Sequence, residues 1–140
     1  MRAVRPLSDL AGNRRGAAAI EFGLLLAPFL MVTFGIIELG TYGMERQALL
    51  ESVHAGARYA VVHGSKSTSP ATAASLQTLV ANSSSVLTPS SVSVTVTFTP
   101  NNSPGSTVKI VATYPWSSVV PLLKLSSATI TATSVSTILN

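Results

Sequence analysis

The chain has 140 residues, a net charge of +4, only 10% charged residues and a mean hydropathy of +0.45. This length allows one domain with a membrane anchor, and the hydropathy favours an anchored chain over a soluble one. Four of the nine basic residues precede Gly16, and the rest are nearly balanced by acidic residues. No basic surface is left to bind a phosphate backbone, so nucleic-acid binding is excluded. Cysteine is absent, which excludes disulfides and thiolate metal ligands.

Residues 1–16 predict a cytoplasmic leader, because this short basic segment directly precedes a long apolar run. Arg14 and Arg15 flank that run. Since arginine-rich flanks stay in the cytoplasm, we expect a single-pass protein of the cytoplasmic (inner) membrane, with its N-terminus inside and its C-terminus outside.

Residues 17–43 predict a transmembrane helix, since they are apolar apart from a few positions such as Glu21 and Thr33. About 20 residues rising roughly 1.5 Å each span a hydrocarbon core of about 30 Å. A cleaved secretory signal would have a shorter apolar core and an A-x-A-like site after it, and the chain offers none. Twin-arginine export is supported only by the Arg14-Arg15 pair. A retained helix therefore fits best.

Residues 44–63 predict an amphipathic continuation of the same helix, which would end near Val62 before Gly64. The expected polar row contains Gln47, Glu51, His54 and Arg58. The expected apolar row contains Met44, Ala48, Ala55, Tyr59 and Val62, and Gly56 and Ala60 flank it.

Residues 64–140 predict an extracytoplasmic α+β domain with about three strands. Ser69-Pro70 resembles an N-cap followed by proline, which predicts a short helix whose inner face holds Leu76, Leu79 and Val80. Apolar and polar residues then alternate with period two over residues 91–99, 106–114 and 127–139.

Two irregularities interrupt these strands. Pro115 is expected to end the second strand and to leave Trp116 in a loop, and the alternation slips near Ser134, which predicts a β-bulge. One apolar face per strand and one amphipathic helix nevertheless predict a small antiparallel sheet packed on the outer half of the long helix.

The start of the apolar run resembles a prepilin-peptidase site, in which cleavage follows a glycine and the fifth mature residue is glutamate. The resemblance implies cleavage between Gly16 and Ala17, with Glu21 in the fifth position and Phe22 completing a Glu-Phe pair. Independently, a carboxylate at the bilayer centre costs roughly 2.5–3.5 kcal/mol and needs a partner, which a free amine at Ala17 would supply. The alternative is that Glu21 snorkels to the headgroups.

Three further elements follow along the predicted helix: an E-x-G motif, a Q-A pair and a terminal G-A-R. These are Glu38, Gly40, Gln47, Ala48, Gly56, Ala57 and Arg58. Together with the processing motif, they resemble the TadE-like family of type IV pilin-like minor pseudopilins over Gly16–Arg58. We expect a solvated Glu38 at the outer membrane interface. For Arg58, a simpler interpretation is a cation near a helix C-terminus, which stabilises the dipole by about 0.3–1 kcal/mol.

The resemblance implies a pilin-like fold and a TadE-like minor pseudopilin that takes part in Tad/Flp pilus assembly or secretion. Its expected partners are a prepilin peptidase, other pilins or pseudopilins, the Tad assembly machinery and the lipid bilayer. The alternative is a membrane-anchored extracytoplasmic binding module that never enters a filament.

The sequence contains no catalytic motif, and we expect that the chain is not an enzyme and has no cofactor or metal site. Asp9 is the only aspartate and lies in the leader, while His54 and His63 are nine residues apart and do not share a helix face. No serine lies in a G-x-S-x-G motif.

Overall fold

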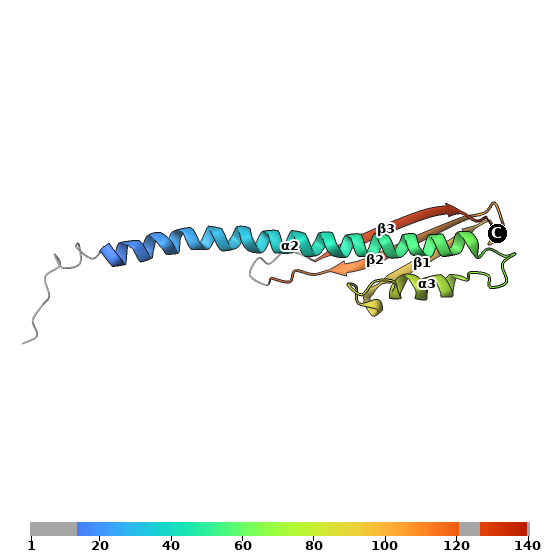
Figure 1. The fold of residues 1–140 in the computed structure, drawn as a ribbon, viewed down its shortest axis with the longest axis horizontal. Coiled ribbons are helices and arrows are strands. Elements are labelled where there is room, and N and C mark those ends of the chain that lie inside the picture. Colours follow the sequence, from blue (N-terminus) through green and yellow to red (C-terminus); the bar gives the residue numbers. More distant parts are fainter. Residues whose placement is uncertain (1–13, 121–126, 140) are drawn as a thin grey trace, which may run out of the picture. The chain divides into compact units, whose positions relative to one another are not determined.

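The computed structural model describes residues 14–120 and 127–139 of the chain. Its elements are α2 (Arg14–Val62), α3 (Ala73–Asn82), the 3₁₀ turn η1 (Pro89–Ser91), β1 (Ser93–Thr99), β2 (Thr107–Trp116) and β3 (Ala128–Thr137) (Figure 1). A long apolar N-terminal helix is followed by a small three-stranded antiparallel sheet, which confirms the predicted α+β class. Most of the predicted leader lies outside the described residues. The chain divides into two compact units at Ile37 and Glu38.

The second unit, Glu38–Asn140, which we call the outer unit, is built on the outer part of α2. The row of α2 side chains that faces its core differs from the predicted row. Leu49, Val53, Ala57 and Ala60 are buried at intervals of three to four residues. In the predicted apolar row, only Ala48 is buried, whereas Met44 and Val62 are 56% and 52% exposed. Gly56 and Ala60, which flank that row, are buried as well, so the prediction is right on that side of the row and wrong at Met44 and Val62. The predicted polar row is exposed, as expected.

Helix α3 begins one turn later than the sequence suggested. Thr72, rather than Ser69, is the N-cap: its side chain accepts a hydrogen bond from the Ser75 backbone, and the Ser75 hydroxyl accepts one from the Thr72 backbone. This reciprocal capping box satisfies two backbone donors that the helix itself cannot. Of the three residues predicted to face inward, Leu76 and Val80 are buried and Leu79 is half-buried.

The sheet is an antiparallel meander in the order β1-β2-β3. In its register, Val111 of β2 lies between Thr95 of β1 and Thr133 of β3. The pairing of β2 with β3 runs unbroken from Thr107↔Thr137 to Trp116↔Ala128. Two predictions are thereby corrected: there is no bulge at Ser134, and β2 continues through Pro115 so that Trp116 belongs to the strand. Pro115 pairs with the β3 strand near the end of β2, where a missing donor costs least.

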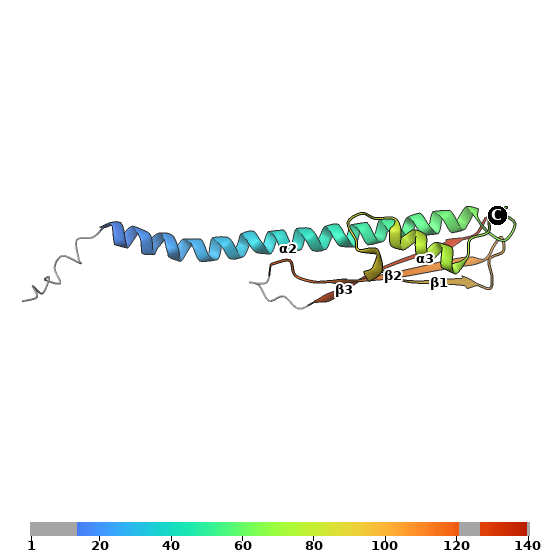
Figure 2. The same cartoon turned by 90° about the horizontal axis from the view of Figure 1, so that it is seen from below.

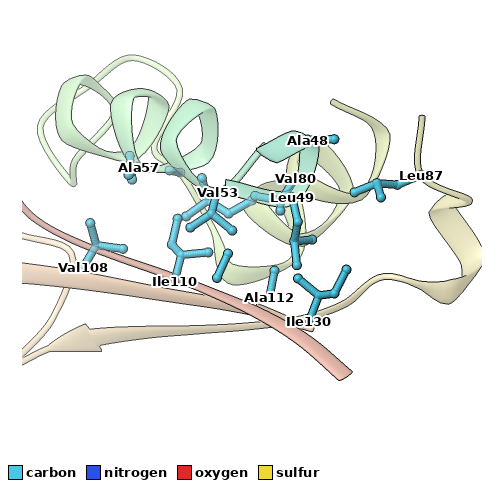
Figure 3. Close-up of a cluster of buried hydrophobic side chains, with 14 of the residues drawn as sticks. Ala48, Leu49, Val53, Ala57, Val80, Leu87, Val108, Ile110, Ala112 and Ile130 are labelled. Atoms are coloured by element: carbon cyan, nitrogen blue, oxygen red, sulfur yellow. The ribbon is translucent and has the colours of Figure 1, made fainter. Parts of the chain in front are cut away.

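Both helices of the second unit lie on one face of the sheet (Figure 2). Figure 3 shows Val53 of α2 over Ile110 of the central strand, and Leu49 of α2 over Ala112 and Ile130 of the sheet. The predicted packing of the sheet on the outer half of the long helix is confirmed.

The opposite face of the sheet carries hydroxyl side chains on all three strands. Its exposed members are Ser93, Thr95, Thr97, Thr99, Lys109, Pro115, Thr129, Thr131, Thr133, Val135 and Thr137. We call these residues the threonine face.

Candidate functional site

The N-terminal part of α2 has an apolar surface that nothing in the described chain covers. Ile20, Phe22 and Leu25 are 67%, 64% and 71% exposed. Its Thr33 hydroxyl donates to the Phe29 carbonyl at 2.9 Å, so this polar group is satisfied within the helix. Among the described residues, α2 is the one helix that is long and apolar enough to cross a membrane, judged by length and composition. These features suggest a single-pass membrane protein.

The predicted processing residues lie at the start of this surface. Gly16 and Ala17 are in the first turn of α2 and exposed, and Glu21 lies one turn further on. No hydrogen bond or ion pair reaches Glu21 from residues 16–120 or 127–139. The described part of one chain therefore leaves its carboxylate free for a partner outside it.

Glu38 is buried, at 1% exposure, and the expectation of a solvated carboxylate was wrong. Its Oε1 accepts a hydrogen bond from the Ser118 hydroxyl at 2.7 Å and another from the Val120 backbone N–H. The chain after β2 folds back over the helix and covers Glu38. A buried carboxylate is tolerated only when hydrogen bonds replace its lost hydration. The two hydrogen bonds to Glu38 thus hold residues 118–120 against α2.

Aromatic and acidic side chains extend this contact along the same face of the helix. Tyr42, one turn after Glu38, packs edge-on against Trp116 with ring centroids 5.6 Å apart. Glu45 follows one turn later, and burial raises the pKa of its carboxyl group. Within the described residues, Glu38 Oε2, Glu45 Oε2 and Trp116 Nε1 are buried without a hydrogen-bond partner. This end of the unit is therefore rich in polar groups that the local packing does not fully satisfy.

The G-A-R motif contains two packing residues. A Cβ built on Gly56 would lie 2.5 Å from Val80 Cγ2 and 3.3 Å from Ile110 Cδ1, so only glycine leaves room for α3 and the sheet. Ala57 beside it is 3% exposed, and Ala48 of the Q-A pair is also buried. These three positions hold the domain together and need no external partner to explain them.

Gly40, Gln47 and Arg58 are exposed and make few contacts within the fold. A Cβ at Gly40 would meet nothing within 4 Å. Gln47 donates to Glu51 at 3.1 Å on the exposed surface, and within the described residues Arg58 forms no ion pair. These three positions remain available to other molecules.

Two open grooves flank this part of α2. The first, of about 590 Å³, lies between α2 and the segment after α3. It is lined by Met44, Gln47, Ala48, Glu51, Ser52, Ala55, Arg58, Ser83, Ser84, Ser85 and Val86. The second, of about 540 Å³, lies between the end of α2 and β3, and Arg58 lines both. The structure thus brings Gln47, Ala48 and Arg58 of the motif to one groove.

The two histidines have separate surroundings. His54 is exposed on α2, whereas the His63 ring stacks on Tyr59 at 3.8 Å and its Nδ1 lies 2.9 Å from the Tyr59 carbonyl. Over residues 14–120 and 127–139, no group of three or more histidine, aspartate or glutamate side chains is arranged to hold a metal ion.

The described chain thus consists of a long helix with an exposed apolar N-terminal part and a small antiparallel sheet backed by helices, an α+β arrangement. The family described as TadE-like protein matches residues 16–58, which confirms the resemblance over the segment that carried it. Neither a curated protein nor a solved structure matches the chain. The family match and the apolar helix fit a protein associated with the Tad pilus machinery and with a membrane.

The sequence reasoning missed Ser118, Val120 and Trp116 as the surroundings of Glu38. One signal was present: a carboxylate in an apolar run needs a partner, and this argument applies to Glu38 as well as to Glu21. The partner itself, 80 residues further along the chain, carries no motif.

Proposed function

We propose that this chain is a TadE-like minor pseudopilin that takes part in Tad/Flp pilus assembly or secretion after cleavage by a prepilin peptidase. The observation that carries the proposal is the TadE-like match over residues 16–58, which falls on a helix whose N-terminal part is apolar and uncovered. We place the chain in the cytoplasmic (inner) membrane with its C-terminus outside, and we assign it no catalytic role.

In this proposal the helix works by exchanging lipid for neighbouring helices. Association inside a bilayer gains from close packing and from satisfied polar groups, since lipid tails are as apolar as the side chains they cover. Cleavage after Gly16 would give Ala17 a free amine, four residues before Glu21. The unpaired Glu21 carboxylate would then fix the register of neighbours through charge pairing, in one chain or between two.

The motif residues divide between two tasks in the same proposal. Glu38, Gly56 and Ala57 shape the outer domain, whereas Gly40, Gln47 and Arg58 stay accessible for partner proteins of the pilus machinery. This division explains why the motif continues well beyond the apolar half of the helix.

A second candidate is a membrane-anchored binding module that never enters a filament. The threonine face favours it, because β1 and β3 present exposed hydroxyls there that a ligand could bind.

N-terminal sequencing of the membrane-extracted protein from cells that contain the peptidase tests the proposal. The mature chain should begin at Ala17, and Gly16→Leu should leave the precursor intact. Gly23→Leu is the matched control, since Gly23 lies in the same helix with open space around it and should not affect cleavage. An unprocessed native N-terminus would refute the pseudopilin and favour the anchored module. Co-isolation with pilus components then separates filament entry from simple anchoring.

A further inference from the structure

Two serines occupy the helix-facing side of β3, where apolar residues are expected. Ile130 and Ala132 are buried on that side, Ser134 and Ser136 come next, and Ile138 is buried just beyond the strand. The continuous register shows that no bulge turns the serines away from the helix. Within the described residues, neither hydroxyl has a hydrogen-bond partner, although both residues are half-buried.

The α2 side chains across from these serines include two nitrogen-rich groups. His54 and Arg58, one turn apart on α2, line the 540 Å³ groove together with Ser134 and Ser136. The remaining lining is apolar and comes from Ala57, Val61 and Val62 of the helix. The backbone hydrogen bond from Leu139 N to the Val61 carbonyl, at 3.0 Å, fixes the end of the strand to the end of the helix. The groove is thus a defined feature of the folded unit.

Packing alone does not account for this composition. The other residues on this side of β3 and just beyond it, Ile130, Ala132 and Ile138, are apolar and buried, whereas Ser134 and Ser136 are half-buried and present their hydroxyls to the groove. An arginine without an ion pair also contributes no contact of its own to the fold. Places where a local rule is broken without a compensating gain are expected to be functional.

We propose that this groove binds the C-terminal carboxylate of a partner protein whose last residue is apolar. The planar Arg58 guanidinium can hold both carboxylate oxygens, and the two serine hydroxyls and the His54 ring supply further donors. The apolar floor formed by Ala57 and Val61 suits the carbon stem of such a group better than a fully hydrated inorganic ion. The site belongs to the outer unit and does not depend on the filament role proposed above.

Nuclear magnetic resonance of the two histidine rings tests this site in the full chain, held in lipid nanodiscs. N-acetyl-leucine serves as the probe, and N-acetyl-leucinamide, which lacks the charge, serves as its matched control. The acid should shift the His54 ring signals to saturation while the signals of the stacked His63 stay in place, and the amide should shift neither.

Variants test which side chains bind the N-acetyl-leucine that shifts the His54 ring signals. Arg58→Gln should weaken binding more than tenfold, since a hydrogen bond to a charged group contributes about 1.5–3 kcal/mol and 1.4 kcal/mol is a factor of ten. Ser134→Ala combined with Ser136→Ala should weaken binding severalfold and leave the melting temperature unchanged or higher. Lys109→Gln removes an equal charge from the threonine face and should leave binding unchanged.

Four outcomes would overturn the proposal. They are an unmoved His54, an equal response to the amide, tighter binding of inorganic phosphate than of N-acetyl-leucine, and a serine double variant that loses stability. The last would show that the serines serve packing. None of these outcomes bears on cleavage at Gly16, so the proposed function and this site fail separately.

Discussion

Gly56 offers the sharpest test of how the outer unit is packed. Replacing it with alanine adds one methyl group at the point where α2, α3 and β2 meet. That methyl carbon would lie 2.5 Å from Val80 Cγ2, well inside the distance at which carbon atoms touch. Val80 is buried and β-branched, so it cannot rotate out of the way without cost.

Two opposing terms set the size of the effect. Overpacking a close-packed core costs about 1–3 kcal/mol, whereas alanine in place of glycine inside a helix returns about 1 kcal/mol. We therefore expect Gly56→Ala to lower the free energy of unfolding by about 0–2 kcal/mol, and by about 1–3 kcal/mol relative to a Gly→Ala change that gains the helix propensity without overpacking. For a unit of this size each kcal/mol corresponds to roughly 4–8 °C in melting temperature. Gly40→Ala gains the same helix propensity with open space around the new methyl group, so its melting temperature should stay equal or rise.

Thermal unfolding followed by tryptophan emission measures both variants in the full chain. Trp116 is the only tryptophan and is buried in this unit, so its signal reports on the unit's packing. Adding Val80→Ala to Gly56→Ala should cost less than the sum of the two single changes, because the smaller residue removes the overlap. If Gly56→Ala is as stable as Gly40→Ala, the packing role assigned to Gly56 is wrong.

Three acidic residues give further predictions. Glu38→Ala should lower the free energy of unfolding of the outer unit by roughly 1–3 kcal/mol, because it leaves the Ser118 hydroxyl and the Val120 N–H without their acceptor. Glu38→Gln keeps an acceptor oxygen at this position and should cost less. Burial raises the pKa of Glu45, so the folded state holds this proton more tightly than the unfolded chain does. The contribution of Glu45 to stability should be greatest below about pH 4.5 and be lost as pH rises through the raised pKa, and Glu45→Gln should remove this contribution from a plot of melting temperature against pH. Glu21→Gln should be processed normally but weaken assembly by on the order of 1–3 kcal/mol, seen as defective piliation or cross-linking at a normal protein level; intact piliation would leave only snorkelling for Glu21.

Periodicity and turn chemistry were enough to predict the elements of the fold. The apolar run and the later alternation predicted α2 and the three strands, because each pattern follows from side-chain geometry within one element. The inner face of α2 was harder, since alanine, glycine and small apolar residues surround the helix between Met44 and Val62. Which row faces inward depends on the position of the sheet, and no local pattern encodes that.

The slip in β3 shows a second limit of sequence reasoning. Ser134 and Ser136 interrupt the apolar alternation of the third strand, and this interruption predicts a β-bulge. The unbroken register shows that both serines lie on the helix-facing side of the sheet. The backbone is therefore regular there, and only the polarity of the side chains departs from the pattern. For Glu38, a contact with Ser118 that spans 80 residues replaced the expected solvent.

The threonine face has a consequence for how copies of this protein can crowd together. Its β-branched side chains stiffen the strands, while their hydroxyls keep the face hydrated. Any neighbour that pressed against it would have to strip water from many hydroxyls and replace each hydrogen bond, or lose roughly 1–3 kcal/mol for every one left unmade. With Lys109 as the one charged member of this face, long-range attraction cannot offset that loss. A partner of this face would therefore need hydrogen bonds matched to its hydroxyls, and in the filament role proposed above the helix side is the better surface for contacts between subunits.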